Sequence, residues 1–378
     1  MYVKGVGMTR FGVEDLTASS MVFEAACKAL GDANMSMDNI DAVVVSTTDG
    51  LKNSEMQRHY PSLLCSLFKK KMPVIRIPAV CGGGGAAFWS ALRLKYNNIL
   101  VVAGEKLLST TSQKITDDIL QAAERVWEQH EGLLFPVQNA LIAQQHMLKH
   151  STTEKDLALV AYKNHLNAAK NPKARFYKKN IKLSHIRKSP IVASPFRLMD
   201  CSVSVNGAAA VVISNEKSDI KVIGSALNTE SLPTFEREDM TTFTACKLAG
   251  ETAYKQAGIT PDELDVVEVH DAFTILELMA YEDLGFCKKG EGKELIRSGK
   301  TFIDGKLPVN TSGGLKAKGH PISATGLAQI VEIVEQLRGK SGERQVKNAK
   351  LGLAQNTGGA GGTVSVHIFK NTADYGEA

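Results

Sequence analysis

The chain repeats one pattern at two places: residues 29–45 read ALGDANMSMDNIDAVVV, and residues 253–269 read AYKQAGITPDELDVVEV. The two segments align without gaps, with aspartates and apolar residues at matching positions. Upstream, the strand-like residues 3–8 resemble residues 222–226, and downstream the glycine turn and helix after Cys81 resemble the turn and helix around His320. Self-similarity of this kind indicates a duplicated fold. Each half is expected to run strand, helix, strand, glycine turn, helix, strand.

Strands alternating with helices at this spacing predict an α/β protein with a mostly parallel sheet covered on both faces. In the first half we expect strands at residues 43–45, 73–79 and 99–103. Residues 107–200 have no counterpart in the second half and are predicted to be an insertion of helices and basic loops. We therefore predict an N-terminal half at residues 1–215 and a C-terminal half at residues 216–378.

Composition excludes several classes of protein. Hydrophobic residues make up 43% of the 378 residues and charged residues 22%, which is typical of globular proteins. The six cysteines show no CxxC spacing, which indicates reduced thiols and no zinc site. The apolar stretches are far shorter than the ~20 residues of a membrane span, and the N-terminus does not resemble an export signal. The net charge of +5 is small for a nucleic-acid binder, so we expect a cytoplasmic protein that binds neither nucleic acid nor membrane.

Cys81 lies between the end of a predicted strand and a predicted helix, and four glycines (residues 82–85) follow it directly. In parallel α/β sheets, ligands bind outside the carboxyl ends of strands. The positive end of a helix dipole lowers a thiol pKa and so increases the thiolate fraction, which predicts a nucleophile here. The alternative is that Cys81 is a small buried apolar residue.

Three further segments end strands in the same way. His270 and Asp271 follow the buried strand that includes residues 266–269, His320 precedes a helix, and residues 356–362 form a glycine-rich turn whose N–H groups can bind an oxyanion. A thiol nucleophile with a histidine base is what acyl transfer through a thioester requires.

These motifs resemble the thiolase superfamily, and most of all the sterol-carrier-protein-2 type and the archaeal relatives that make acetoacetyl-CoA. The match rests on Cys81 with its glycine turn, residues 270–273 (HDAF), residues 319–321 (GHP) and residues 358–362 (GGAGG), with support from residues 206–210 and 310–315. The resemblance implies two duplicated halves in layers α-β-α-β-α. It covers nearly the whole chain.

The resemblance also implies an acetyl-CoA acetyltransferase. Cys81 would be acetylated while His320 takes the thiol proton, and a second acetyl-CoA would then attack the acetyl group. His270 and His320 would hold the enolate oxygen, and the N–H groups of Cys81 and Gly358 the oxyanion of the acyl-enzyme intermediate. The remaining implied roles are Asn310 and Asn356 as substrate-site residues, and Lys178, Lys179 and Arg187, from a stretch with eight basic residues between 170 and 188, as contacts to coenzyme A.

Two positions depart from the family pattern. Ordinary thiolases have an acid/base cysteine where Asn356 stands, and the sterol-carrier type has one where Ala272 stands. The group that removes the α-proton is therefore open between His270, Cys201 and water. Alternative functions are a decarboxylating or aldolase-type carbon–carbon enzyme, and a non-catalytic assembly or channelling subunit.

Partners and cofactors are also implied by the resemblance. CoA thioesters would be substrates, with no tightly bound cofactor and no metal. The protein would be a homodimer or larger, would form acetoacetyl-CoA for the mevalonate pathway of isoprenoid synthesis, and would assemble with 3-hydroxy-3-methylglutaryl-CoA synthase and a zinc-containing OB-fold protein.

Overall fold

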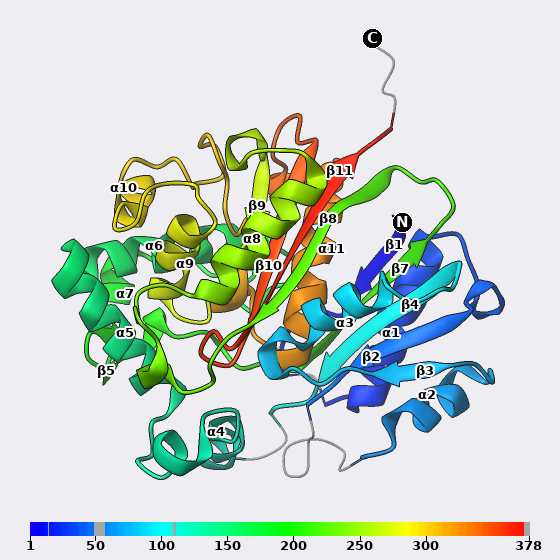
Figure 1. The fold of residues 1–378 in the computed structure, drawn as a ribbon, viewed down its shortest axis with the longest axis horizontal. Helices are drawn as coiled ribbons and strands as arrows, with labels where there is room; N and C mark the ends of the chain where they lie inside the picture. Colours follow the sequence, from blue (N-terminus) through cyan, green and yellow to red (C-terminus); the bar gives the residue numbers. More distant parts are fainter. Residues whose placement is uncertain (14, 49–56, 109–110, 374–378) are drawn as a thin grey trace.

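The computed structural model describes residues 1–13, 15–48, 57–108 and 111–373 (Figure 1). Nine strands join in one sheet in the order β3-β2-β4-β7-β1-β8-β11-β10-β9. The strands of the first half come first in this order, and those of the second half follow. The first half contains β1 (Tyr2–Met8), α1 (Ala18–Asp32), β2 (Ala42–Ser46), α2 (Tyr60–Phe68), β3 (Val74–Arg76), α3 (Gly83–Ala91), β4 (Asn98–Glu105) and β7 (Gly207–Ser214).

The second half repeats this arrangement. It contains β8 (Ile220–Thr229), α8 (Thr244–Ala257), β9 (Val266–Glu268), α9 (Thr274–Asp283), α10 (Gly292–Arg297), α11 (Thr325–Leu337), β10 (Leu351–Gly358) and β11 (Thr363–Asn371). The strand run β1-β7-β4-β2 of the first half corresponds to β8-β11-β10-β9, and both runs pair antiparallel, antiparallel and then parallel. The predicted duplication and the α/β class are confirmed. The pairing is mixed, because parallel pairs join only β3-β2-β4 and β9-β10.

The helices form three layers around the two parts of the sheet. Helix α1 packs on β1, β4 and β7, and α8 packs on β8 and β11. Helices α3 and α11 lie between the halves, since each contacts strands of both (Figure 1). This is the α-β-α-β-α order that the resemblance implies. The strands accordingly bury both faces: Val44 and Val101 point into the core with α3 and α11, whereas Val43 and Val102 point into the core under α1.

The insertion between β4 and β7 covers the second half of the molecule. It contains α4 (Ser112–Leu120), α5 (Phe135–His150), α6 (Glu154–Ala169), α7 (Leu183–Lys188) and the hairpin of β5 (Ile191–Ala193) and β6 (Phe196–Arg197). Helix α6 contacts α9 and the turn Gly314–Lys318, which immediately precedes the His320 loop. The insertion thus contacts the segments that follow His270 and precede His320. Within the described residues, no helix combines the length and apolar character needed to cross a membrane.

One close contact is duplicated along with the fold. A Cβ added to Gly5 in β1 would lie 2.2 Å from the carbonyl oxygen of Ala29 in α1. A Cβ added to Gly224 in β8 would lie 2.4 Å from the carbonyl oxygen of Ala253 in α8. Ala29 and Ala253 are the first residues of the two repeated segments. In both halves, glycine therefore allows the outer helix to approach the strand backbone.

We predict that Gly5→Ala lowers the free energy of unfolding by about 1–3 kcal/mol, because the methyl group overlaps the backbone of α1. Gly31→Ala is the matched control, since Gly31 lies in α1 itself and no atom is within 4 Å of its added Cβ. That change is expected to be stabilising by up to about 1 kcal/mol, the helix-propensity difference. Urea unfolding followed by circular dichroism measures both, and a neutral Gly5→Ala would contradict the close packing.

Candidate active site

The predicted catalytic residues meet where the two halves join. Cys81 lies in the helical turn Val80–Gly82 between β3 and α3, and His270 follows β9. His320 precedes α11, the repeat counterpart of α3. Val80, directly before the nucleophile, has φ 48°, a left-handed conformation that costs a β-branched residue about 1–3 kcal/mol. The surrounding fold therefore holds the Cys81 turn in a strained shape.

Cys81, His270 and His320 line a single cavity of about 260 Å³. Its other polar or backbone members are Thr116, Asn139, Cys201, Ser202, Ser204 and Gly359, and its apolar walls are Leu107, Leu108, Ile115, Ile119, Phe135, Pro136, Ala272, Phe273, Leu276 and Ile322. Much of the apolar wall comes from α4 and α5 of the insertion. The cavity is thus a largely apolar chamber with a thiol and two imidazoles, as suits a thioester whose acyl group must be shielded from water.

Asn356 determines the protonation of His270. The Asn356 amide oxygen accepts from the backbone N–H of Gly85 (3.2 Å), and its Nδ2 donates to the carbonyl oxygen of Cys81 (3.1 Å). These two contacts fix the orientation of the amide, so Nδ2 also donates to His270 Nδ1 (3.1 Å), which accepts a second N–H from Thr357 (3.3 Å). A nitrogen that accepts two N–H groups carries no proton, so the proton of the neutral ring is on Nε2.

The two imidazoles are neutral and stacked edge to face. Burial and the neighbouring His320 lower the pKa of His270 well below its ordinary value, and burial lowers the pKa of His320 to about 4. Their ring centres are 5.4 Å apart at 89°. His320 Nδ1 lies 2.7 Å from the hydroxyl of Thr325, the first residue of α11. At neutral pH, His270 is therefore a hydrogen-bond donor, and His320 is free to accept a proton.

The Cys81 thiol differs from the sequence-based expectation. Burial raises its pKa to about 12, Glu105 adds to the increase, and hydrogen bonds from the N–H groups of Gly359 and of Cys81 itself oppose it. The predicted lowering by the helix dipole is wrong because desolvation of the thiolate outweighs the favourable backbone groups. Cys81 is consequently a thiol at rest and needs a base to react.

Asp271 joins the loops that carry the two histidines. Its carboxylate accepts from the N–H of Leu315 (2.6 Å) and from the amide of Asn164 in α6 (2.7 Å). Burial and the neighbouring Glu277 raise its pKa to about 7. The segment after β9 is thereby tied to the turn Gly314–Lys318, so His270 and His320 are positioned by one network.

Three residues predicted to bind the substrate or its oxyanion lie behind the cavity and do not line it. The Asn310 side chain accepts from the N–H of Val269 (2.9 Å) and donates to Glu277 (2.7 Å), so it supports the His270 loop and is not among the cavity-lining residues. Gly358 packs against Gly82, and it is the next residue, Gly359, whose N–H bonds the Cys81 sulfur. Asn356 likewise acts on Cys81 and His270 from behind.

The three basic residues predicted to bind coenzyme A are exposed and are not among the residues that line the cavity of Cys81. Lys178 is 5.2 Å from the ring of Tyr177, and Lys179 is in the same loop between α6 and α7. Arg187, in α7, borders a separate depression between α6 and α7. The structure does not bring the three to Cys81, and their role stays a prediction.

Sequence reasoning missed several residues that organise the site. Thr325 and Thr357 hydrogen bond the two histidines, but a threonine beside a glycine turn carries no specific signal in a single sequence. Residues 201–206 form an extended segment that bridges Phe273 through Cys201 and His320 through Ser204. Cys201 in this segment was already a candidate for the α-proton base, whereas nothing in the sequence indicated that Ser204 pairs with His320.

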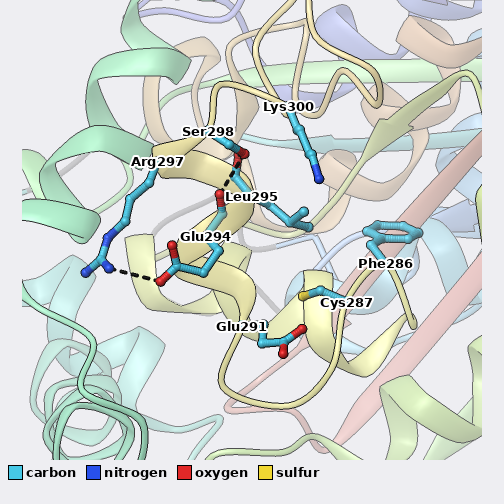
Figure 2. A pocket seen from close by; sticks show the side chains of 8 residues that line it. All are labelled: Phe286, Cys287, Glu291, Glu294, Leu295, Arg297, Ser298 and Lys300. Atoms are coloured by element: carbon cyan, nitrogen blue, oxygen red, sulfur yellow. Dashed lines mark hydrogen bonds and ion pairs between the residues drawn. The ribbon is translucent and has the colours of Figure 1, made fainter.

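A second, open depression of about 580 Å³ lies beside α10 and contains no histidine (Figure 2). Figure 2 shows its charged side chains, among which Arg297 pairs with Glu294 at 3.0 Å, and its cysteine, Cys287. Among the residues that the structure describes, no group of three or more His, Cys, Asp or Glu side chains could hold a metal ion.

The raised pKa of Cys81 predicts no thiolate at rest. The ultraviolet thiolate absorbance of the wild-type protein should equal that of Cys81→Ala from about pH 6 to about pH 9, because the thiol ionises only at higher pH. A difference that develops below about pH 8 would reveal a Cys–His ion pair and contradict the neutral pair described above.

The hydrogen bonds of Asn356 predict a large effect of Asn356→Asp. A carboxylate repels the Cys81 carbonyl oxygen and accepts a hydrogen bond from His270 only if the ring proton is on Nδ1, which reverses the tautomer and removes the Nε2–H donor. We expect kcat to fall by about 10²–10³, the usual effect of losing one such donor. The control is Asn97→Asp, because Asn97 is exposed on the surface and this change should leave kcat unchanged. Asn310→Asp would not serve, because the Asn310 side chain is also buried. Unchanged kcat in Asn356→Asp would contradict the assigned tautomer.

Comparison with known proteins agrees with the geometry. The family described as "Thiolase, N-terminal domain" matches residues 1–194, and "Thiolase C-terminal domain-like" matches residues 225–371. The chain is 40% identical over 381 residues to an "Acetyl-CoA acetyltransferase" of Methanothermobacter thermautotrophicus, covering 97% of this chain and 98% of the relative. It is 31% identical to "Sterol carrier protein 2" of Bos taurus, covering 98% of this chain and 72% of the relative.

Among solved structures, the chain is similar to "Ltp2-ChsH2(DUF35) aldolase", with a TM-score of 0.83 at 24% identity over 99% of this chain and 98% of that chain. This likeness shows a shared fold. With both thiolase descriptions matched and a relative at 40% identity over nearly the whole chain, this protein belongs to the thiolase family.

Proposed function

We propose that this protein condenses two molecules of acetyl-CoA to acetoacetyl-CoA and CoA, or catalyses the reverse thiolysis, through an acetyl-Cys81 intermediate. The observation that carries the proposal is that one apolar cavity contains a protonated thiol beside two neutral imidazoles of different roles. The 40% identical archaeal relative is named for the same activity.

His320 is the base for Cys81 in this mechanism. As Cys81 Sγ attacks the thioester carbonyl, its proton passes to His320, and the carbon–sulfur bond of acetyl-CoA then breaks to release CoA. Because burial lowers the pKa of His320 to about 4, its ring is neutral and available at neutral pH. The N–H groups near the sulfur, those of Cys81 and Gly359, would stabilise the oxyanion of the tetrahedral intermediate.

His270 is the donor for the second half of the reaction. When a second acetyl-CoA loses an α-proton, negative charge develops on its thioester oxygen, and the Nε2–H of His270 would stabilise that enolate. A neutral donor suits this role because it needs no change of protonation during the step. The carbanion attacks the acetyl group on Cys81, and the expelled Cys81 thiolate recovers its proton from His320.

The setting of the enzyme is proposed on the resemblance. Acetoacetyl-CoA would feed 3-hydroxy-3-methylglutaryl-CoA synthase in the mevalonate pathway, in a cytoplasmic complex that includes this synthase and a zinc-containing OB-fold protein. A homodimer or larger assembly is proposed on the same ground. Gel filtration and co-purification with the synthase test these points separately from the chemistry.

The direct test is to incubate the purified protein with acetoacetyl-CoA and CoA and to follow acetyl-CoA. We expect turnover, acetylation of Cys81 detectable by mass spectrometry, and loss of both in Cys81→Ala. Cys27→Ala is the matched control, because Cys27 is an exposed thiol on α1 outside the cavity, and it should retain full activity. Turnover of malonyl-CoA or of a β-hydroxyacyl-CoA in place of acetoacetyl-CoA would contradict the proposal.

A further inference from the structure

We propose that Cys201 is the acid/base group that protonates the departing CoA sulfur and then removes the α-proton of the second acetyl-CoA. The inference rests on the proposed function, because it assigns the one proton transfer in that reaction for which neither histidine is suited.

His270 is excluded by its hydrogen bonds. Its Nδ1 accepts N–H groups from both Asn356 and Thr357, and its Nε2 carries the proton of the neutral ring. The ring therefore has no free lone pair for a carbon-bound proton. The amide of Asn356 cannot replace it, because Nδ2 has no basic lone pair and Oδ1 is bound to the N–H of Gly85.

His320 is occupied at the same moment. In the proposed cycle, the proton that Cys81 loses must be kept for the expelled Cys81 thiolate, and His320 is the group that accepts it, so His320 does not also serve the α-proton. A low pKa of about 4 also makes it a weak base for a carbon acid, even when it is neutral. A second base is needed in the same cavity.

Cys201 is placed for this role. It lines the cavity together with Cys81, His270 and His320, and it forms an antiparallel bridge with Phe273, three residues after His270. The next residue, Ser202, donates its N–H to the carbonyl oxygen of Ala272 (2.8 Å), so the segment is fixed against the His270 loop. Cys81 and Cys201 are the two cysteines among the lining residues described above.

The surroundings of Cys201 hold it as a thiol at rest and make its thiolate a strong base, because burial raises its pKa to about 11. Its Sγ lies 3.6 Å from the carbonyl oxygen of Arg197, an acceptor that suits a protonated thiol. The Lys316 ammonium donates to the backbone carbonyl of Cys201 (2.7 Å) and favours the thiolate, whereas Asp200 opposes it. Burial, the largest influence, raises the Cys201 pKa to about 11, which is a far better match to a carbon acid than His320 provides.

The proton balance closes with these three side chains. Cys81 gives its proton to His320 as the acetyl group transfers, and Cys201 gives its proton to the departing CoA thiolate, which leaves as CoA thiol. The Cys201 thiolate then takes the α-proton of the second acetyl-CoA. A carbon–carbon bond forms as the carbanion attacks acetyl-Cys81, and the expelled Cys81 thiolate takes the proton back from His320. All three side chains return to their resting states.

The experiment separates the two half-reactions in the purified full-length protein. Acetyl transfer is measured as exchange between acetyl-CoA and isotopically labelled CoA. Removal of the α-proton is measured as deuterium incorporated from heavy water into the methyl group of acetyl-CoA. The variants are Cys201→Ala and Cys201→Ser, and Cys287→Ala is the matched control, since Cys287 is also a partly buried thiol but lines the separate depression of Figure 2.

We expect both Cys201 variants to keep acetyl exchange within about tenfold of wild type, because a CoA thiolate can leave and be protonated by water. Deuterium incorporation should fall by about 10² or more, as when a general base is lost. Cys287→Ala should match wild type in both measurements.

Deuterium incorporation that survives in Cys201→Ala would overturn the assignment, as would an equal loss of both activities in the two Cys201 variants, which would indicate a structural role. A wild-type protein that shows no acetyl exchange would instead contradict the proposed function itself.

Discussion

The amide of Asn356 is the interaction on which the arrangement of the site depends. Through three hydrogen bonds it contacts the backbone N–H of Gly85 in α3, the carbonyl oxygen of Cys81, and the imidazole of His270. The first two belong to the first half of the chain, and His270 and Asn356 belong to the second. One side chain therefore joins the two halves of the chain at this site and holds His270 in one tautomer.

Close packing of glycines makes this contact possible. A Cβ added to Gly326 in α11 would lie 2.3 Å from the backbone nitrogen of Gly85 in α3 and 2.4 Å from the Asn356 amide oxygen. The two central helices thus meet backbone to backbone beside Asn356. Helices α3 and α11 are repeat counterparts, and each follows one of the predicted catalytic residues. The duplication therefore brings the Cys81 turn, before α3, close to the His320 segment, before α11.

The sequence predicted the parts of the molecule that repeat or that carry a motif. The match of residues 29–45 with 253–269 identified the duplication, and the positions of Cys81, His270 and His320 at predicted strand ends identified three residues that the structure brings into one cavity. Their catalytic roles remain proposals. The insertion was predicted as a segment without a counterpart, but nothing in its composition indicated that α4 and α5 contribute to the cavity walls.

Properties that depend on burial and on partners distant in sequence could not be predicted. The direction of the Cys81 pKa shift was wrong because the cost of desolvating a thiolate depends on the tertiary packing around it, which the sequence does not show. The use of Asn310 behind the cavity follows from its contacts with Val269 and Glu277, which are 41 and 33 residues away. The antiparallel centre of the sheet also escaped prediction; it occurs in both halves, with and without an insertion before the antiparallel strand.

The central claim is that His270 is a neutral donor held by Asn356, and nitrogen-15 NMR of the histidine rings tests it most directly. With the His270 resonances identified by comparison with a His270→Asn variant, the account predicts a protonated Nε2 and an unprotonated Nδ1 throughout the neutral pH range. A protonated Nδ1, or an imidazolium ring near neutral pH, would contradict it.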